Sequence, residues 1–147
     1  MNLRRYEARD RDALIALWRR AFPDDPPHNE PSAVLDAKLA VDDLVFVAEE
    51  GNRLVGACLA GYDGHRGWLY SMAVAAERRR EGIGAALVER AVAALGELGC
   101  VKVNLQVRAS NEAVAAFYET LGFAREERTS LGRLLGTPAT GARDDAR

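Results

Sequence analysis

The sequence has few cysteines and no long apolar run, and these two absences exclude several classes of protein. Its 147 residues contain only Cys58 and Cys100, whose spacing fits neither a metal site nor a redox pair. No apolar stretch approaches the roughly 20 residues that span a bilayer, and the N-terminus lacks the apolar core of a signal peptide. We therefore interpret both thiols as buried, and we expect a cytosolic protein without a membrane partner.

An excess of charge of one sign is also lacking. The formal net charge is −2, and the basic residues are dispersed except at residues 78–80, so we expect no nucleic-acid partner. Apolar residues make up 48% of the chain, which is enough for a packed core, and we predict one domain over residues 1–135. Residues 136–147 are small and polar without periodicity, which predicts a flexible tail.

The apolar pattern predicts strands and helices that alternate along the chain. Strands are expected at residues 3–8, 44–49, 53–61, 68–74, 101–107 and 123–131, the last as a final strand or hairpin arm. Helices are expected after Asp10 or Asp12, after Ser32, from residue 83 to Gly96 or Gly99, and over residues 111–121. Residues 50–52 read as a hairpin turn, and residues 68–107 as a parallel strand–helix–strand unit.

A glycine turn stands at the centre of this pattern, between an apolar strand and the longest predicted helix. Gly82 and Gly84 open that helix, whose first N–H groups lack partners within it and carry partial positive charge. Glycines let a phosphate approach the backbone, and arginines at 78–80 add positive charge beside it. The same residues also fit a plain tight turn with a solvated arginine run.

Two well-known phosphate-binding motifs are excluded at this turn. A P-loop needs a Lys-Ser/Thr pair after its second glycine, and the chain has no such pair. The dinucleotide fingerprint needs a third glycine or alanine where Leu87 stands.

Two segments resemble the GNAT N-acetyltransferase superfamily. The first is Arg79-x-x-Gly82-x-Gly84 after an apolar strand, which resembles that superfamily's acetyl-coenzyme A signature. The second is LQVRASNEAVAAFYETLGF at residues 105–123, which resembles its strand–asparagine–helix segment. In local motif this second segment is most similar to the branch that acetylates protein N-termini (ribosomal-protein alanine).

The resemblance implies a fold and a cosubstrate. The fold is α/β (α+β), with a central mixed, mostly antiparallel, twisted sheet of about six to seven strands, about four helices on both faces and a splayed parallel strand pair. The cosubstrate is acetyl-CoA. The pantetheine would lie along the strand edge at Met72, Ala73 and Val74. The residues expected at the pyrophosphate or elsewhere on the cofactor are Arg79, Arg80, Glu81, Gly82, Ile83, Gly84 and Asn111.

The resemblance also implies an acyltransferase that passes acetyl directly to a primary amine of a small molecule or peptide. Tyr118 is the candidate acid that protonates the leaving thiolate, with a plain aromatic core position as its alternative. Asn111 is in addition a favoured helix N-cap. An enzyme would need all of these groups, whereas a non-catalytic acyl-CoA-binding module, the alternative hypothesis, would need no acid.

The general base and the acceptor are not identified by the sequence. Gln106 stands where the similar branch carries a glutamate, and a glutamine cannot accept a proton at neutral pH. Asp63, His65 and Tyr70 are candidates for the acceptor side, with a water chain as the alternative. Carboxylates that could make the acceptor rim acidic are Asp24, Asp25, Glu30 and Asp63. The sequence leaves a homodimer open.

Overall fold

The computed structural model describes residues 1–136 and contains one five-stranded sheet in the order β1-β2-β3-β4-β5. Its strands are β1 (Asn2–Arg5), β2 (Val45–Glu50), β3 (Arg53–Tyr62), β4 (Gly67–Val74) and β5 (Val103–Leu105). Its α-helices are α1 (Arg11–Ala21), α2 (Pro31–Val41), α3 (Ile83–Glu97) and α4 (Glu112–Thr120). Neighbouring strands are antiparallel except β4 and β5, which are parallel, so the predicted mixed α/β sheet with four α-helices is confirmed.

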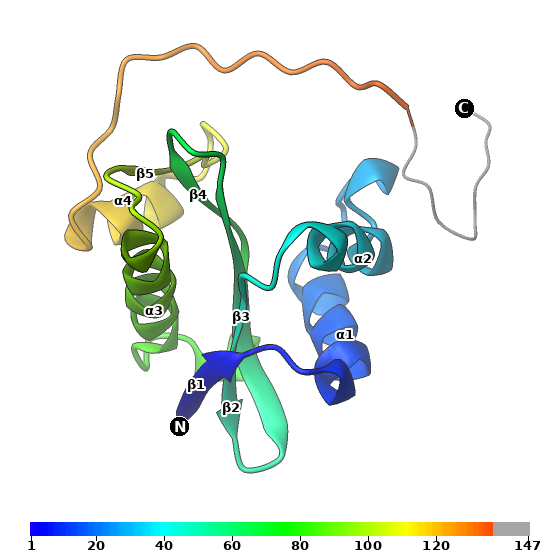
Figure 1. Ribbon diagram of the computed structural model, residues 1–147. Coiled ribbons are helices and arrows are strands. Elements are labelled where there is room, and N and C mark those ends of the chain that lie inside the picture. Colours follow the sequence, from blue (N-terminus) through cyan, green and yellow to red (C-terminus); the bar gives the residue numbers. More distant parts are fainter. Residues whose placement is uncertain (137–147) are drawn as a thin grey trace.

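The helices cover both faces of the sheet, with α3 and α4 on one side and α1 and α2 on the other (Figure 1). Successive side chains of a strand point to opposite faces, so the buried run from Val45 to Ala48 feeds two cores. Phe46 and Ala48 pack toward α3, whereas Val45 and Val47 pack toward α1. This double burial explains why β2 is a continuous apolar run rather than an alternating one.

Two helix starts differ in detail from the prediction. The N-cap of α2 is Glu30, whose carboxylate accepts the N–H groups of Ser32 and Ala33, so the prediction that Ser32 caps this helix is wrong. Asp10 does precede α1, but its carboxylate binds Arg4 and the Glu7 N–H instead of the helix. Glu30 therefore satisfies donors of the first turn of α2, whereas Asp10 satisfies donors that precede α1.

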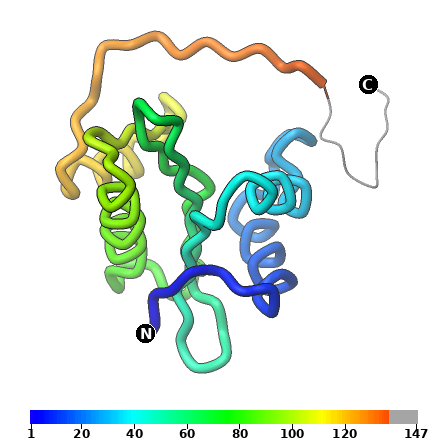
Figure 2. Tube along the Cα trace, in the orientation of Figure 1, coloured from blue at the N-terminus to red at the C-terminus, as the bar shows by residue number. Residues whose placement is uncertain are grey.

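The predicted final strand at residues 123–131 is wrong. After α4 the described chain runs extended without joining the sheet, which therefore has five strands and not six or seven (Figures 1 and 2). Strand β5 is also shorter than the predicted 101–107. The sequence AREERTS at residues 124–130 is polar, so it has little apolar surface to bury against a helix. The predicted tail at 136–147 lies outside the described residues except for Gly136.

Both cysteines are free thiols, and the prediction that both are buried holds for Cys58 but not for Cys100, which is partly exposed. No helix among residues 1–136 has the length and apolar character that crossing a membrane requires.

Candidate active site

The sheet splits between β4 and β5. These strands pair only where Gly67, Trp68 and Leu69 lie beside residues 103–105, although β4 continues to Val74. On its other side β4 stays bonded to β3, where the Ala75 N–H donates to the Val55 carbonyl at 2.9 Å. Because N–H directions alternate along a strand, the Val74 N–H points away from β3 and into the split. This part of the β4 edge has no backbone partner among residues 1–136 and can bind an amide chain as a strand would.

A β-bulge lies at the same place in β4. Ala73 pairs with Ala57 and Tyr70 with Leu59, so Ser71 and Met72 together oppose Cys58. Ser71 has a φ of 52°, and its carbonyl accepts the indole N–H of Trp18 at 2.9 Å. Bulges bend a strand and re-aim its groups. Helix α1 thus holds the bend that turns the edge of Met72, Ala73 and Val74 away from β5.

The glycine turn lies beside the end of β4. Gly82 is the N-cap of α3 with a φ of 85°, and no atom lies within 4 Å of where a Cβ would be. Arg80, one residue before Glu81, also has a positive φ, of 68°. A Cβ on Gly84 would lie 3.3 Å from the Phe117 ring and 3.7 Å from the Val74 side chain. The first turn of α3 is therefore packed between β4 and α4, with open space in front of Gly82.

The three arginines of this turn have different surroundings. Arg78 binds the carboxylates of Glu50 and Glu81, which raise the pKa of its guanidinium, so it braces the turn. Arg79 and Arg80 are exposed and form no ion pair with any described residue. Those two side chains can reach an anion at the helix start. Open backbone donors together with mobile guanidinium groups fit a pyrophosphate.

Ile83 and Glu81 are turned away from this anion site. The Ile83 side chain is 2% exposed and packs on β3 at Gly56, where an added Cβ would lie 2.9 Å from it. The Glu81 carboxylate is occupied by Arg78. Only the backbone amides of these residues can serve a ligand. Gly56 was not singled out from the sequence, although a glycine inside an apolar strand signals a close approach by another element.

Tyr118 of α4 lies in the core on the α3–α4 side of the sheet. It is 7% exposed and packs edge-on against Phe117 and Phe123, with ring centroids 4.9 and 5.6 Å away. Burial, and next the nearby Cys58 thiol, raise the pKa of Tyr118 to about 12. Its hydroxyl has no hydrogen-bond partner among residues 1–136, which is uncommon for a buried polar group. The hydroxyl is therefore a protonated donor that lacks an acceptor.

Asn111 caps α4, because its side-chain oxygen accepts the Val114 N–H at 3.3 Å. The capping role that the sequence suggested is confirmed. The contact closes the first turn of α4.

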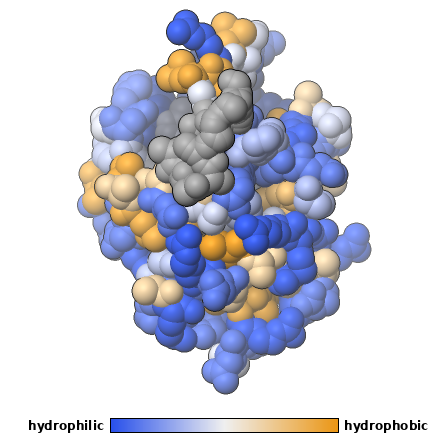
Figure 3. Space-filling view, turned by 90° about the vertical axis from the view of Figure 1, so that its right-hand side faces the viewer, coloured by the Kyte–Doolittle hydropathy of each residue, from blue (hydrophilic) through white to orange (hydrophobic). Residues whose placement is uncertain are grey.

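A cavity of about 510 Å³ opens on the α2 side of the split. Its polar and aromatic lining comprises Lys38, Tyr62, Asp63, Trp68, Tyr70 and Gln106. Lys38 is bound to Asp42 at 2.8 Å and lies 5.6 Å from the centre of the Tyr70 ring. Trp68 and Tyr70 are the exposed side chains of β4. Figure 3 shows a mostly hydrophilic surface on the α1–α2 side of the molecule. Lys38 and Trp68 were missed in the sequence, although Trp68 alternates with Tyr70.

The candidates for a general base are weakly placed. Asp63 accepts the backbone N–H groups of Arg66 and His65, which lower the pKa of its carboxyl. His65 does not line the cavity, and Gln106 donates its amide to Ser130 at 2.6 Å. The structure thus brings Asp63, Tyr70 and Gln106 to the cavity, but the lowered pKa of Asp63 does not suit a base at neutral pH and Gln106 cannot accept a proton there.

Two of the four carboxylates predicted at the acceptor rim, Glu30 and Asp25, are paired with arginines. Burial would raise the pKa of Glu30, but hydrogen bonds from the Ser32 hydroxyl and N–H, Arg19 and the Ala33 N–H outweigh it and hold the pKa at about 2. Asp25 lies 3.5 Å from Arg108. Glu30 is therefore a helix cap and half of an ion pair, and Asp24 and Asp63 are the exposed acids of the predicted set.

This site was compared with known proteins. Residues 11–123 match the Acetyltransferase (GNAT) family. An acetyltransferase of Pectobacterium atrosepticum is 38% identical over 92% of this chain and 96% of its own length. Two solved structures have the same fold. An aminoglycoside N-acetyltransferase in complex with CoA has a TM-score of 0.77 and 19% identity, covering 92% of this chain and 95% of its own. The ribosomal-protein-S18-alanine N-acetyltransferase from Escherichia coli has a TM-score of 0.74 and 25% identity, covering 85% and 78%.

These similarities decide between the two hypotheses drawn from the sequence. The ribosomal-protein alanine branch is one structural neighbour among many, so the local motif does not single it out. A non-catalytic module finds no support, because the relatives are acetyltransferases. The chain belongs to the GNAT family of acetyltransferases and is an N-acetyltransferase enzyme.

Proposed function

We propose that this protein transfers acetyl directly from acetyl-CoA to a primary amine in a ternary complex, within one domain formed by residues 1–135. The observation that carries the proposal is the split of the sheet after Leu69 and Leu105, beside the open first turn of α3. The split gives an amide chain an edge to pair with, and the turn gives its phosphates a row of donors. We expect the cytosol as the compartment, because both cysteines are free thiols.

In this proposal acetyl-CoA is bound mainly by backbone. The edge of Met72, Ala73 and Val74 pairs with the pantetheine, and the amides from Arg79 to Gly84 donate to the pyrophosphate. Arg79 and Arg80 add charge, and Asn111 fixes the start of α4 beside the cofactor. The Val74 N–H, which points into the split, is well directed to donate to the thioester oxygen, where negative charge develops during attack.

The chemical step needs one proton donor on the α4 side. The amine nitrogen attacks the thioester carbon, the carbon–sulfur bond breaks, and the amine loses one proton while the sulfur gains one. Tyr118 supplies the sulfur's proton in our proposal. Its pKa of about 12 lies above that of a thiol near 8.5, so the transfer has to accompany departure of the sulfur. A hydroxyl without another acceptor is free to make that contact.

The acceptor approaches from the opposite face of the sheet. We place it in the cavity between α2 and β4, so that the part of the molecule that bears the amine lies against Trp68 and Tyr70. Asp63 stays ionised at neutral pH and favours a cationic amine there, and the exposed aromatic faces favour the same charge. The cationic amine loses one proton to water in this open cavity before it attacks and a second one as the amide forms, because no lining residue is a suitable base.

The experiment is to measure free CoA thiol released from acetyl-CoA in the presence of a panel of primary amines. The panel contains alkyl and arylalkyl amines, an aminoglycoside and peptides with N-terminal alanine. Amine-dependent CoA release with formation of the acetamide is expected. Tight binding of acetyl-CoA without release by any amine would overturn the catalytic proposal.

A further inference from the structure

Strand β4 reverses the direction of its N–H groups at the bulge. Before the bulge, the Gly67 N–H donates toward β5, to the Lys102 carbonyl at 2.9 Å. After the bulge, the Ala75 N–H donates toward β3, to the Val55 carbonyl at 2.9 Å. Residues 67 and 75 are an even number of positions apart, so in a regular strand their N–H groups would point to the same side. The extra residue of the bulge therefore decides which amides face the split.

The side chains of β4 show the same reversal. Leu69, before the bulge, packs in the core on the α3 side of the sheet. Ala73 and Ala75, which also have odd numbers, pack in the core on the α1 side. Met72 and Val74 pack on the α3 side instead. A strand without the bulge would put the Val74 side chain against α1 and turn its N–H toward β3, so the split would lose this donor.

A hydrogen bond from helix α1 reaches the bulge. The Trp18 indole N–H donates to the Ser71 carbonyl at 2.9 Å, and the Trp18 side chain is buried. Ser71 has a φ of 52°, which costs free energy in a residue with a Cβ, and such conformations persist where the surroundings enforce them. A buried indole N–H in turn needs an acceptor, and the Ser71 carbonyl is that acceptor. The contact therefore favours the strained conformation of Ser71.

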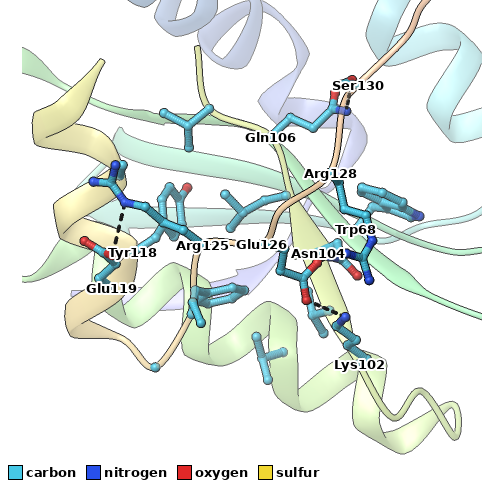
Figure 4. Close-up of a pocket in the computed structure, with 18 of the residues that line it drawn as sticks. Trp68, Lys102, Asn104, Gln106, Tyr118, Glu119, Arg125, Glu126, Arg128 and Ser130 are labelled. Carbon is cyan, nitrogen blue, oxygen red and sulfur yellow. Dashed lines mark hydrogen bonds and ion pairs between the residues drawn. The ribbon is translucent and has the colours of Figure 1, made fainter. Parts of the chain in front are cut away.

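Strand β5 does not pair with this part of β4. Backbone pairing between the two strands ends at Leu69. Asn104 of β5 donates its amide to Glu126 at 3.0 Å. Gln106 donates its amide to Ser130 at 2.6 Å, and Figure 4 shows both of these side chains turned toward the segment after α4. The hydrogen bonds that hold the bulge therefore come from β3 and α1.

We propose that Trp18 is a positioning residue for acetyl transfer, which holds the Ser71 carbonyl, keeps the extra residue in β4 and so aims the Val74 N–H at the thioester. This inference rests on the proposed function, in which the Val74 N–H donates to the thioester oxygen. Trp18 acts through the backbone of β4 and not on the substrate. Because negative charge develops on that oxygen during attack, a misaimed donor lowers kcat more than it lowers affinity for acetyl-CoA.

The test combines Trp18→Phe with Ser71→Gly in a double-mutant cycle. Phenylalanine keeps an aromatic ring in the core but has no N–H to donate. Trp18→Phe is expected to lower kcat about tenfold, the factor that corresponds to one hydrogen bond of ordinary net strength. In the Ser71→Gly background the same substitution should lower kcat at most about twofold, since glycine adopts positive φ without the Cβ penalty. An equal loss in both backgrounds would overturn the proposal.

Amide hydrogen exchange gives a second measurement that does not depend on catalysis. The Ala75 N–H faces β3 only while the bulge is present, so Trp18→Phe should raise its exchange rate about tenfold, and Ser71→Gly should reverse most of this increase. If the unsubstituted protein released no CoA with any amine, the proposed function would fail, and exchange would still decide whether Trp18 holds the bulge. An exchange rate that Trp18→Phe leaves unchanged would overturn the positioning role in either case.

A truncation in the same core separates positioning from general stability. Leu35 of α2 is fully buried in the core that contains Trp18, and it does not line the acceptor cavity. Leu35→Ala should lower the free energy of unfolding, whereas kcat and the exchange rate of Ala75, measured well below the unfolding transition, should stay unchanged. Trp18→Phe also leaves some space in this core. A loss of kcat in Leu35→Ala as large as that in Trp18→Phe would assign the effect to core packing and overturn the proposal.

Discussion

The two ends of the sheet are built differently. Strand β2 pairs with β3 along its whole length, and residues 45–48 are fully buried between two layers of helices. Strands β4 and β5 share three residue pairs, and all residues of β5 are partly exposed. Pairing that ends early costs stability, but it frees a row of backbone groups for a ligand. The closed β2–β3 end therefore holds the fold, and the open β4–β5 end is available for chemistry.

Truncating one leucine at each end measures this difference most directly. Leu59→Ala in β3 is expected to lower the free energy of unfolding by about 2–5 kcal/mol, because a fully buried side chain leaves a cavity. Leu105→Ala in β5 should cost at most about 2 kcal/mol, since less apolar area is lost. Urea unfolding of both variants gives the two values. Equal losses would mean that the β4–β5 end contributes as much to stability as the β2–β3 end.

Tyr118→Phe tests whether the open end carries the chemistry. Turnover is expected to fall by roughly 10²-fold while acetyl-CoA affinity hardly changes, because the hydroxyl acts only as the sulfur departs. The free energy of unfolding should stay the same or rise slightly, since the removed hydroxyl has no partner within residues 1–136. The measurements are kcat, calorimetric affinity and urea unfolding. Unchanged turnover would leave Tyr118 as a core residue only.

The contrast between the closed and the open end of the sheet also explains which strands the sequence could predict. Three strands, β2, β3 and β4, were located within one residue at each end, because each is a run of apolar residues bounded by turn signals. The final strand was wrong because an extended segment becomes a strand only if an edge is within reach, and that depends on distant parts of the fold. Similarly, Gly56 is explained by contact with α3, whose residues lie about 27 positions further along the chain.

The sequence predicted the parts of the site that depend on backbone conformation better than the parts that depend on the partners of charged side chains. Gly82 and Gly84 occupy the helix start that their spacing predicts, because positive φ and close packing both require glycine. In contrast, Glu30 was expected on the acceptor rim but serves as a helix cap, and Lys38 was overlooked because its neighbours belong to other elements. Which partner a charged side chain finds is decided by tertiary contacts.

Two glycines with positive φ allow the anion site at the start of α3 to be compared with a control position in the β2–β3 hairpin. Gly82 and Gly51 both have positive φ and open space at the Cβ position, and only Gly82 lies at the start of α3. Both Gly82→Asp and Gly51→Asp should cost about 1–2 kcal/mol of stability through strain. Gly82→Asp should in addition weaken acetyl-CoA binding at least tenfold, because its carboxylate repels the pyrophosphate. Calorimetry that found equal affinities for the two variants would remove the phosphate role of this turn.

The smallest expected effect is the acid sensitivity of the two regions. The hydrogen bonds from the Arg4 guanidinium lower the pKa of Asp10, which is 4% exposed beside β1, whereas Asp63 is exposed near β4. Because the folded-state pKa of Asp10 lies below its unfolded value, its ionised form stabilises the fold above about pH 4, and this contribution is lost as the pH falls through the folded pKa.

Asp10→Asn should therefore cost about 1 kcal/mol at pH 7, since the amide keeps one acceptor for Arg4. The difference from the unsubstituted protein should shrink as the pH falls through the folded pKa of Asp10, because Asp10 itself then becomes protonated. Asp63→Asn, the control in the open region, should leave the free energy of unfolding almost unchanged at pH 7, because this side chain is exposed. Urea unfolding from pH 2 to 7 measures both, and a difference for Asp10→Asn that did not shrink in acid would show that the Arg4 contact does not depend on the charge of Asp10.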